Sequence, residues 1–149
     1  MASGIGDTSE ANAILLLFNN TDWANVGDAG GLQNSATAGS LYVGLSTGTL
    51  SDTSTQTTTQ AAYTSYSRVA VARSGAGWTC SANTASNAGA TTFPAATGGS
   101  ETETDFSIGL ASGTGAGDIL FWGALTGSLA VSTGITPSFA LGSLTASIT

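Results

Sequence analysis

The feature that most constrains this chain is the small size of its side chains. Glycine, alanine, serine and threonine occupy 89 of the 149 positions. Because large apolar residues are sparse, the core should be thin, as in a sandwich of sheets. Threonine is β-branched and favours extended backbone, and its hydroxyl keeps an outer face soluble without charge. The composition therefore predicts a protein built mainly from β-strands.

Alternation of apolar and polar residues supports this prediction from residue 41 onward. Leu41, Val43 and Leu45 alternate with smaller or more polar neighbours, and Gly-rich turns separate similar short stretches further along. We expect a mainly β fold, an antiparallel β-sandwich or jelly-roll-like barrel with one short N-terminal α-helix. The other expected strands are 66–73, 78–81 (its hairpin partner), 90–93, 102–110, 119–125, 129–132 and 139–148, the last broken at Gly142, while 51–60 is expected to be an exposed loop.

One helix is expected over residues 8–19, with Asp7 and Glu10 at capping-box spacing. Its apolar residues fall at i, i+3, i+4 and i+7, which makes a stripe that has to dock onto its own sheet or onto a neighbouring subunit. The second alternative makes three residues interface candidates: Ile14, Leu17 and Phe18. At this length we expect a single β domain, 1–149, with 1–40 as an N-terminal arm of helix plus loop.

Charge excludes several classes of function. The chain has no histidine, its only basic side chains are Arg68 and Arg73, and its formal net charge is −7. Two arginines cannot form the basic stripe that nucleic acid requires, and an anionic membrane is disfavoured for the same reason. Without histidine or lysine the commonest general base and amine nucleophile are missing, so we expect no enzyme and no cofactor. The single Cys80 is expected to be a buried small apolar residue.

Three carboxylates stand at i, i+2 and i+4 on an expected strand: Glu101, Glu103 and Asp105. They share one face there, which makes them candidate calcium ligands. The alternative is a solvated row whose like charges discourage edge-to-edge pairing of strands. A glycosidase pair would need two carboxyl groups across a cleft, which neighbours on one strand do not supply alone.

Three further residues are interface candidates. Arg68 is expected in a salt bridge or in a contact between subunits, where its forked donors suit it. Trp122 points away from Phe121 on the same strand, so one of the two faces something other than the main core. Trp23, in the loop after the helix, completes the set.

Several segments together resemble a family of small tailed-bacteriophage virion proteins, often labelled tail fibre proteins. The resemblance covers nearly the whole chain, and its motifs are turns, aromatic anchors and strand alternation rather than catalytic residues. Where that family tends to have histidines, this chain has Ser46 and Asp105, so a histidine-based metal site is not expected. The segments are 40–46, 63–74, 77–79, 87–88, 93–95, 106–109, 123–126, 129–131 and 134–139.

The resemblance implies a place in the virion, and two placements compete. We expect a head decoration (cement) protein that binds the major capsid protein on the outer capsid surface and stabilises contacts between its subunits. The alternative is a tail-fibre or tail-tip component, which would usually show a longer chain with repeats. In either case we expect a homotrimer, made in the bacterial host cytoplasm because the N-terminus lacks the positive region of a signal peptide. A hydrolase acting on host surface polymer, dependent on Glu103, is the third hypothesis.

Overall fold

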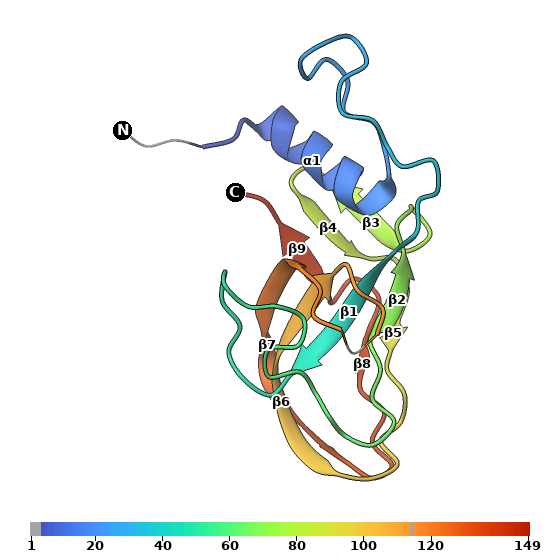
Figure 1. The fold of residues 1–149 in the computed structure, drawn as a ribbon, viewed down its shortest axis with the longest axis vertical. Coiled ribbons are helices and arrows are strands. Elements are labelled where there is room, and N and C mark those ends of the chain that lie inside the picture. Colours follow the sequence, from blue (N-terminus) through green and yellow to red (C-terminus); the bar gives the residue numbers. More distant parts are fainter. Residues whose placement is uncertain (1–3, 114) are drawn as a thin grey trace. The chain divides into compact units, whose positions relative to one another are not determined.

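The computed structural model describes residues 4–113 and 115–149, and it is mainly β with one helix, as predicted (Figure 1). Its strands form a four-stranded sheet (order β2-β1-β6-β7), a three-stranded sheet (β3-β4-β9) and a two-stranded sheet (β5-β8). The registered strand pairs are antiparallel. The elements are α1 (Asp7–Asn19), β1 (Ser40–Ser46), β2 (Val69–Ala72), β3 (Trp78–Ser81), β4 (Thr84–Asn87), β5 (Thr91–Thr92), β6 (Ser100–Gly109), β7 (Ile119–Ser132), β8 (Ser138–Phe139) and β9 (Thr145–Ser147).

The chain divides into two compact units made of interleaved segments. The described residues of 1–40, 72–90 and 140–149 form unit 1, and those of 41–71 and 91–139 form unit 2. The helix expected as part of an N-terminal arm contributes to unit 1, where it contacts β3 and β4. The single domain expected from the chain length stays a prediction.

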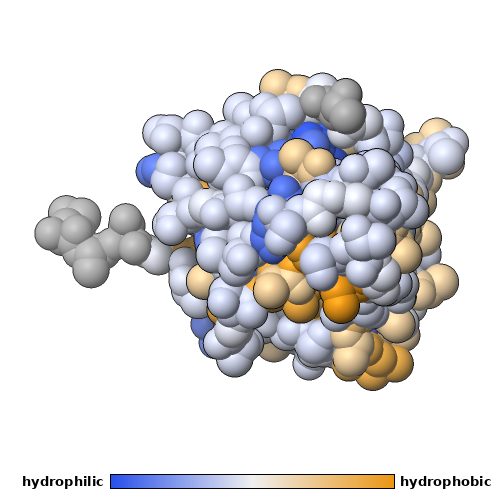
Figure 2. All heavy atoms as spheres, turned by 90° about the horizontal axis from the view of Figure 1, so that it is seen from below, coloured by the Kyte–Doolittle hydropathy of each residue, from blue (hydrophilic) through white to orange (hydrophobic). Residues whose placement is uncertain are grey.

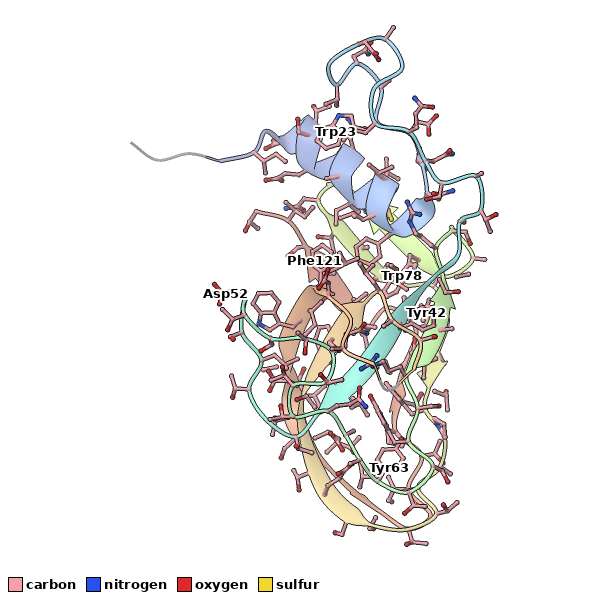
Figure 3. All side chains as sticks on the ribbon, in the orientation of Figure 1. Trp23, Tyr42, Asp52, Tyr63, Trp78 and Phe121 are labelled. Carbon is pink, nitrogen blue, oxygen red and sulfur yellow. The ribbon has the colours of Figure 1, made fainter. Side chains whose placement is uncertain are left out.

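Unit 1 is organised by aromatic packing under α1. Phe18 and Ile14 are fully buried, and the Phe18 ring meets the buried Trp78 of β3 edge-on at 4.8 Å between centroids (Figure 3). Burial of large apolar side chains is the main stabilising contribution to a fold of this kind. The helix therefore docks on its own sheet, the first of the two alternatives.

The ends of α1 differ from the sequence prediction. Gly6 is the N-cap and no side chain caps the helix there, so the capping box of Asp7 and Glu10 does not form. At the other end Asn20 adopts the left-handed conformation that terminates helices. No basic residue lies in the last turn. Arg73 supplies that charge from elsewhere in unit 1, donating to the carbonyls of Leu17 (2.8 Å) and Leu16 (2.6 Å).

Unit 2 is built on the four-stranded sheet, whose two faces differ in chemistry. Residues directly opposite each other across an antiparallel pair lie on the same face. Val43 pairs with Ile108 and Leu45 with Phe106, which makes one face apolar. The rings of Phe106 and Phe139 of β8 meet edge-on with 6.0 Å between their centroids, so the two-stranded sheet packs on that face. The opposite face carries the acidic side chains of β6.

The expected hairpin between residues 66–73 and 78–81 is wrong. β2 is hydrogen-bonded to β1, and β3 pairs instead with β4, a strand that the sequence analysis missed. The connecting turn has only two residues, because Ser81 pairs with Thr84, and Ala82 takes a φ of 49° there. Tight hairpins require a positive φ, which is normally signalled by glycine or asparagine. Because alanine occupies this position, the turn could not be predicted from the sequence.

The two strands expected at 119–125 and 129–132 form one strand, β7, at the edge of the sheet (Figure 1). Glu103 pairs with Leu129 and Asp105 with Ala124, so one residue of β6 faces a bulge of several residues in β7. The gap expected between two strands is therefore this bulge. The predicted break at Gly142 is confirmed, since β8 and β9 lie on either side of it.

The expectation of an exposed loop at 51–60 is wrong at Gln56, which is buried. Its side-chain amide oxygen accepts from the backbone N–H of Ala111 at 2.8 Å. Its backbone N–H donates to the carbonyl of Gly117 at 2.9 Å. A Cβ at Gly109 or Gly117 would collide with the Gln56 side chain. Glycine is required at both positions because this polar plug fills the space beside them.

Candidate functional site

The candidate site of unit 2 is the carboxylate row, which consists of Glu101, Glu103 and Asp105 on β6. The structure places all three on a strand with neighbours on both sides, between β1 and β7. Glu103 is 0% and Asp105 5% exposed, and Glu101 is half-buried. The expected solvated row that protects a sheet edge is therefore wrong, because β6 is a central strand and the row is covered.

Backbone N–H groups hold two members of the row. Glu101 Oε1 accepts from the N–H groups of Ala62 (2.9 Å) and Tyr63 (2.8 Å). Asp105 Oδ2 accepts from the N–H of Leu50 at 3.2 Å. Charge-assisted bonds of this kind are stronger than neutral ones. They fasten the chain that follows β1 onto the face of β6.

Glu103 differs from its two neighbours. No backbone N–H group or basic side chain among the described residues donates to its carboxylate oxygens, and the group that can share a proton with it is the carboxyl group of Glu101. Burial raises the pKa of Glu103 to about 8, and the nearby carboxyl group of Glu101 adds to the increase. At neutral pH this side chain is mostly uncharged, which removes the large cost of an isolated buried charge.

Two tyrosines lie next to Glu103 in the electrostatic environment of the row. Burial raises the pKa of Tyr63 and of Tyr66 to about 12, and the two carboxylates of Glu101 and Glu103 contribute to both increases. The Tyr63 hydroxyl donates to the carbonyl of Pro94 (3.0 Å), and the Tyr66 hydroxyl accepts from the N–H of Leu45 (2.9 Å). The rings meet edge-on at 5.3 Å. Both tyrosines are neutral hydrogen-bonding groups fixed in place.

The hydrogen bonds of Arg68 lie inside unit 2, and their acceptors among the described residues are carbonyl oxygens rather than carboxylates. Arg68 is buried, and its Nη1 donates to the carbonyls of Ala111 (3.0 Å) and Gly115 (3.1 Å). Its Nη2 donates to the Gln60 side-chain oxygen. Burial lowers the pKa of the guanidinium group below its ordinary value. The expected salt bridge is thus replaced by backbone carbonyls, and a contact with another subunit stays a prediction.

The other predicted interface residues are placed very differently from one another. Ile14 and Phe18 are fully buried in unit 1, and Leu17 is half-buried, so a partner could contact the first two only if α1 left its sheet. Trp23 is half-buried and forms a short antiparallel bridge with Leu32 in the loop after α1 (Figure 3).

Trp122 is the interface candidate with the most accessible side chain. It is 41% exposed, whereas Phe121 beside it is partly buried. The prediction that one of these two aromatic residues faces away from the core is therefore confirmed. Large exposed aromatic side chains are enriched in contacts between proteins.

The described residues offer little for catalysis or metal binding. Among residues 4–113 and 115–149, no group of three histidine, cysteine, aspartate or glutamate side chains is placed to hold a metal ion. Glu103 has the raised pKa of a general acid, but its full burial denies it contact with a substrate. Cys80 is partly buried, and burial raises the pKa of its thiol. The face shown in Figure 2 is mostly near neutral in hydropathy, with scattered hydrophilic residues.

Sequence reasoning missed the buried polar residues that organise each unit. In unit 1, Asn87 donates to the carbonyl of Ala140 (2.8 Å) and accepts from the N–H of Leu144 (2.9 Å). In unit 2, the plug is Gln56. An isolated amide side chain among small residues gives no pattern, so no signal in a single sequence would have found either one. No helix of the described chain is both long and apolar enough to cross a membrane.

The described residues form a mainly β body in which both arginines bind backbone carbonyls. A family model described as Podophage GP4 fiber I protein gp80 matches residues 25–147. The chain belongs to this family, and it is a structural protein of a tailed-phage virion. No curated protein matches the chain.

Proposed function

We propose that this chain is a structural subunit of a phage fibre, with no catalytic activity of its own. The observation that carries this proposal is the match of residues 25–147 to a family named for a fibre protein. The chemistry of the body agrees with it. Both arginines are occupied within the chain, and the one carboxyl group with a strongly raised pKa is buried.

Self-association belongs to this proposal, because a fibre is an assembly of copies. The homotrimer expected from the sequence remains the preferred state, since closed symmetry covers sheet edges and apolar surface. Trp122 is the contact residue that we favour, because it is the predicted interface residue that is exposed without any rearrangement.

Head decoration is the second candidate function. One observation favours it: the sequence has no internal repeat or heptad pattern of the kind that long fibres use. In this role it would bind the major capsid protein and stabilise the mature shell by mass action.

Gold-labelled antibodies against the chain, imaged on intact particles, separate the two placements. We expect label along or at the end of the fibres. Label over the whole head surface would support decoration and contradict the fibre proposal.

The contact residue is tested by the occupancy of variant chains on particles that lack the native protein. Trp122→Ala should lower occupancy, because the exposed indole is lost from the contact. The matched control is Leu141→Ala, which removes a side chain that is 71% exposed in unit 1. Equal occupancy of the two variants would reject Trp122 as the contact residue.

A further inference from the structure

The covering of the carboxylate row depends on a short stretch of chain that we call the cover segment, residues 61–66. It is attached to β6 through the two bonds from Ala62 and Tyr63 to Glu101. Two further backbone bonds hold the segment. The N–H of Ala61 donates to the carbonyl of Leu45, and the N–H of Thr64 donates to the carbonyl of Gly98, both at 2.9 Å. All of these groups belong to unit 2.

Glu103 is fully buried beside this segment, and nothing within the described residues compensates a charge on it. The groups that face it from its own strand are Glu101 and Asp105, both acidic. From the cover segment the titratable groups are Tyr63 and Tyr66, with Arg68 beyond Tyr66. A negative charge on Glu103 would therefore be both desolvated and repelled by its neighbours.

The strands on either side bring no compensating charge. β7 contains no ionisable side chain, and Leu129 is the residue that pairs with Glu103. β1 contains only Tyr42, which pairs with Gly109 at the far end of β6. Glu103 ionises at a lower pH when it reaches water, and the layer that we consider for opening is the cover segment, most of whose residues have no regular secondary structure.

We propose that the cover segment is a pH-sensitive flap, which opens from β6 as the solution becomes alkaline because a charge on Glu103 is better tolerated when the flap is open. The device is independent of where in the virion the chain sits. Opening exposes Glu103 to water and breaks the bonds of Ala62 and Tyr63 with Glu101. It also breaks the bonds that the Tyr63 and Tyr66 hydroxyl groups make with Pro94 and Leu45. The rest of the sheet, held by the β1–β6 and β6–β7 ladders, keeps its structure.

The sign of the effect follows from the two forms of Glu103. In the open form its pKa returns toward the ordinary 4.5, whereas in the closed form it is about 8. Below pH 4.5 both forms are protonated and opening does not depend on pH. Between those values each unit of pH favours opening tenfold, and above about pH 8 the effect levels off. The total increase in the opening constant is up to about three thousandfold.

Native-state hydrogen exchange at the N–H groups of Ala62 and Tyr63 tests this proposal in the full chain, after correction for the intrinsic dependence of exchange on pH. We expect their opening constants to rise between pH 5 and pH 8 in the native protein and to stay level in Glu103→Gln. The opening constants of the N–H groups in the β1–β6 ladder should stay level over the same pH range. A level wild-type profile, the same slope in Glu103→Gln, or an equal rise throughout the ladder would overturn the flap.

Two further measurements test the proposal even if Glu103→Gln fails to fold. Titration of the Glu103 side-chain carbon by NMR in the native protein should give a midpoint near pH 8, and a midpoint below pH 5 would overturn the proposal. Glu101→Gln serves as the matched control, since it weakens the attachment of the flap but keeps Glu103. The pH dependence of opening should survive in that variant, and its loss would contradict the role given to Glu103.

Discussion

The two units of this chain differ in the kinds of side chain that they bury. Unit 1 buries a tryptophan, a phenylalanine and an isoleucine against one another, with Arg73 closing the end of its helix. Unit 2 buries Glu103 and Arg68 together with other polar side chains, and satisfies most of them with backbone groups. Unit 2 also has an apolar core, which includes Val43 and Ile108, so the units differ chiefly in that the buried carboxyl groups and the buried arginine of the described residues all lie in unit 2.

This difference has a consequence for how each unit responds to its surroundings. Apolar burial does not depend directly on pH, whereas buried ionisable groups link folding to proton binding. Both units should be sensitive to the loss of apolar volume, and unit 2 should in addition be sensitive to pH. Four predictions test that contrast.

The largest effect is expected from Trp78→Ala in unit 1. The indole is fully buried against Phe18, so its removal should lower the free energy of unfolding by about 3–5 kcal/mol. Urea denaturation followed by circular dichroism measures the loss. Trp122→Ala is the matched control, because that indole is 41% exposed, and its effect should be under about 1 kcal/mol. Similar losses in the two variants would contradict the assignment of the unit 1 core.

Arg68→Met probes the polar interior of unit 2. The variant keeps much of the side-chain volume but leaves the carbonyls of Ala111 and Gly115 without their donor. We expect a loss of about 2–3 kcal/mol in the free energy of unfolding, since hydrogen bonds from a charged donor are lost. A variant as stable as the native protein would show that these bonds do not support unit 2.

The dependence of stability on pH should come from Glu103. Its pKa is raised in the folded state, so the folded chain holds a proton that the unfolded chain releases, and stability falls as pH rises. Between pH 6 and pH 8 the native protein should lose roughly 2 kcal/mol relative to Glu103→Gln. Urea midpoints of both proteins at the two pH values give this difference. If the urea midpoints of both proteins changed equally with pH, Glu103 would not be the cause of the pH dependence.

The smallest effect is expected from Arg73→Met. This variant removes the donors at the carbonyls of Leu16 and Leu17, and with them the positive charge at the end of α1. We expect a loss of about 1–2 kcal/mol and faster hydrogen exchange in the last turn of the helix. Exchange that stays unchanged there would show that Asn20 alone is enough to end the helix.

The sequence predicted the class of fold and most elements because those depend on periodicity. Leu41, Val43 and Leu45 alternate, and the helix at 7–19 has a clear stripe, so both were found. It failed at the β3–β4 hairpin, where Ala82 occupies a position that usually needs glycine or asparagine. A local rule cannot reveal a turn that tertiary packing imposes.

The candidate site was predicted in part. Alternation on a strand correctly grouped Glu101, Glu103 and Asp105, but not their burial. Burial depends on which strands flank β6 and on the cover segment, and both are set by contacts between distant parts of the chain. Acidic side chains are rarely buried, so an exposed edge was the natural expectation.

The central claim, that this chain is a structural part of the phage particle, is tested most directly by quantitative mass spectrometry of gradient-purified particles. Arg68 and Arg73 are the only cleavage sites for trypsin, so digestion should use chymotrypsin or elastase to give peptides of useful length. We predict the chain in several copies per particle, in constant ratio to the other structural proteins across the gradient peak. Its presence in the lysate of infected cells together with its absence from purified particles would contradict the account.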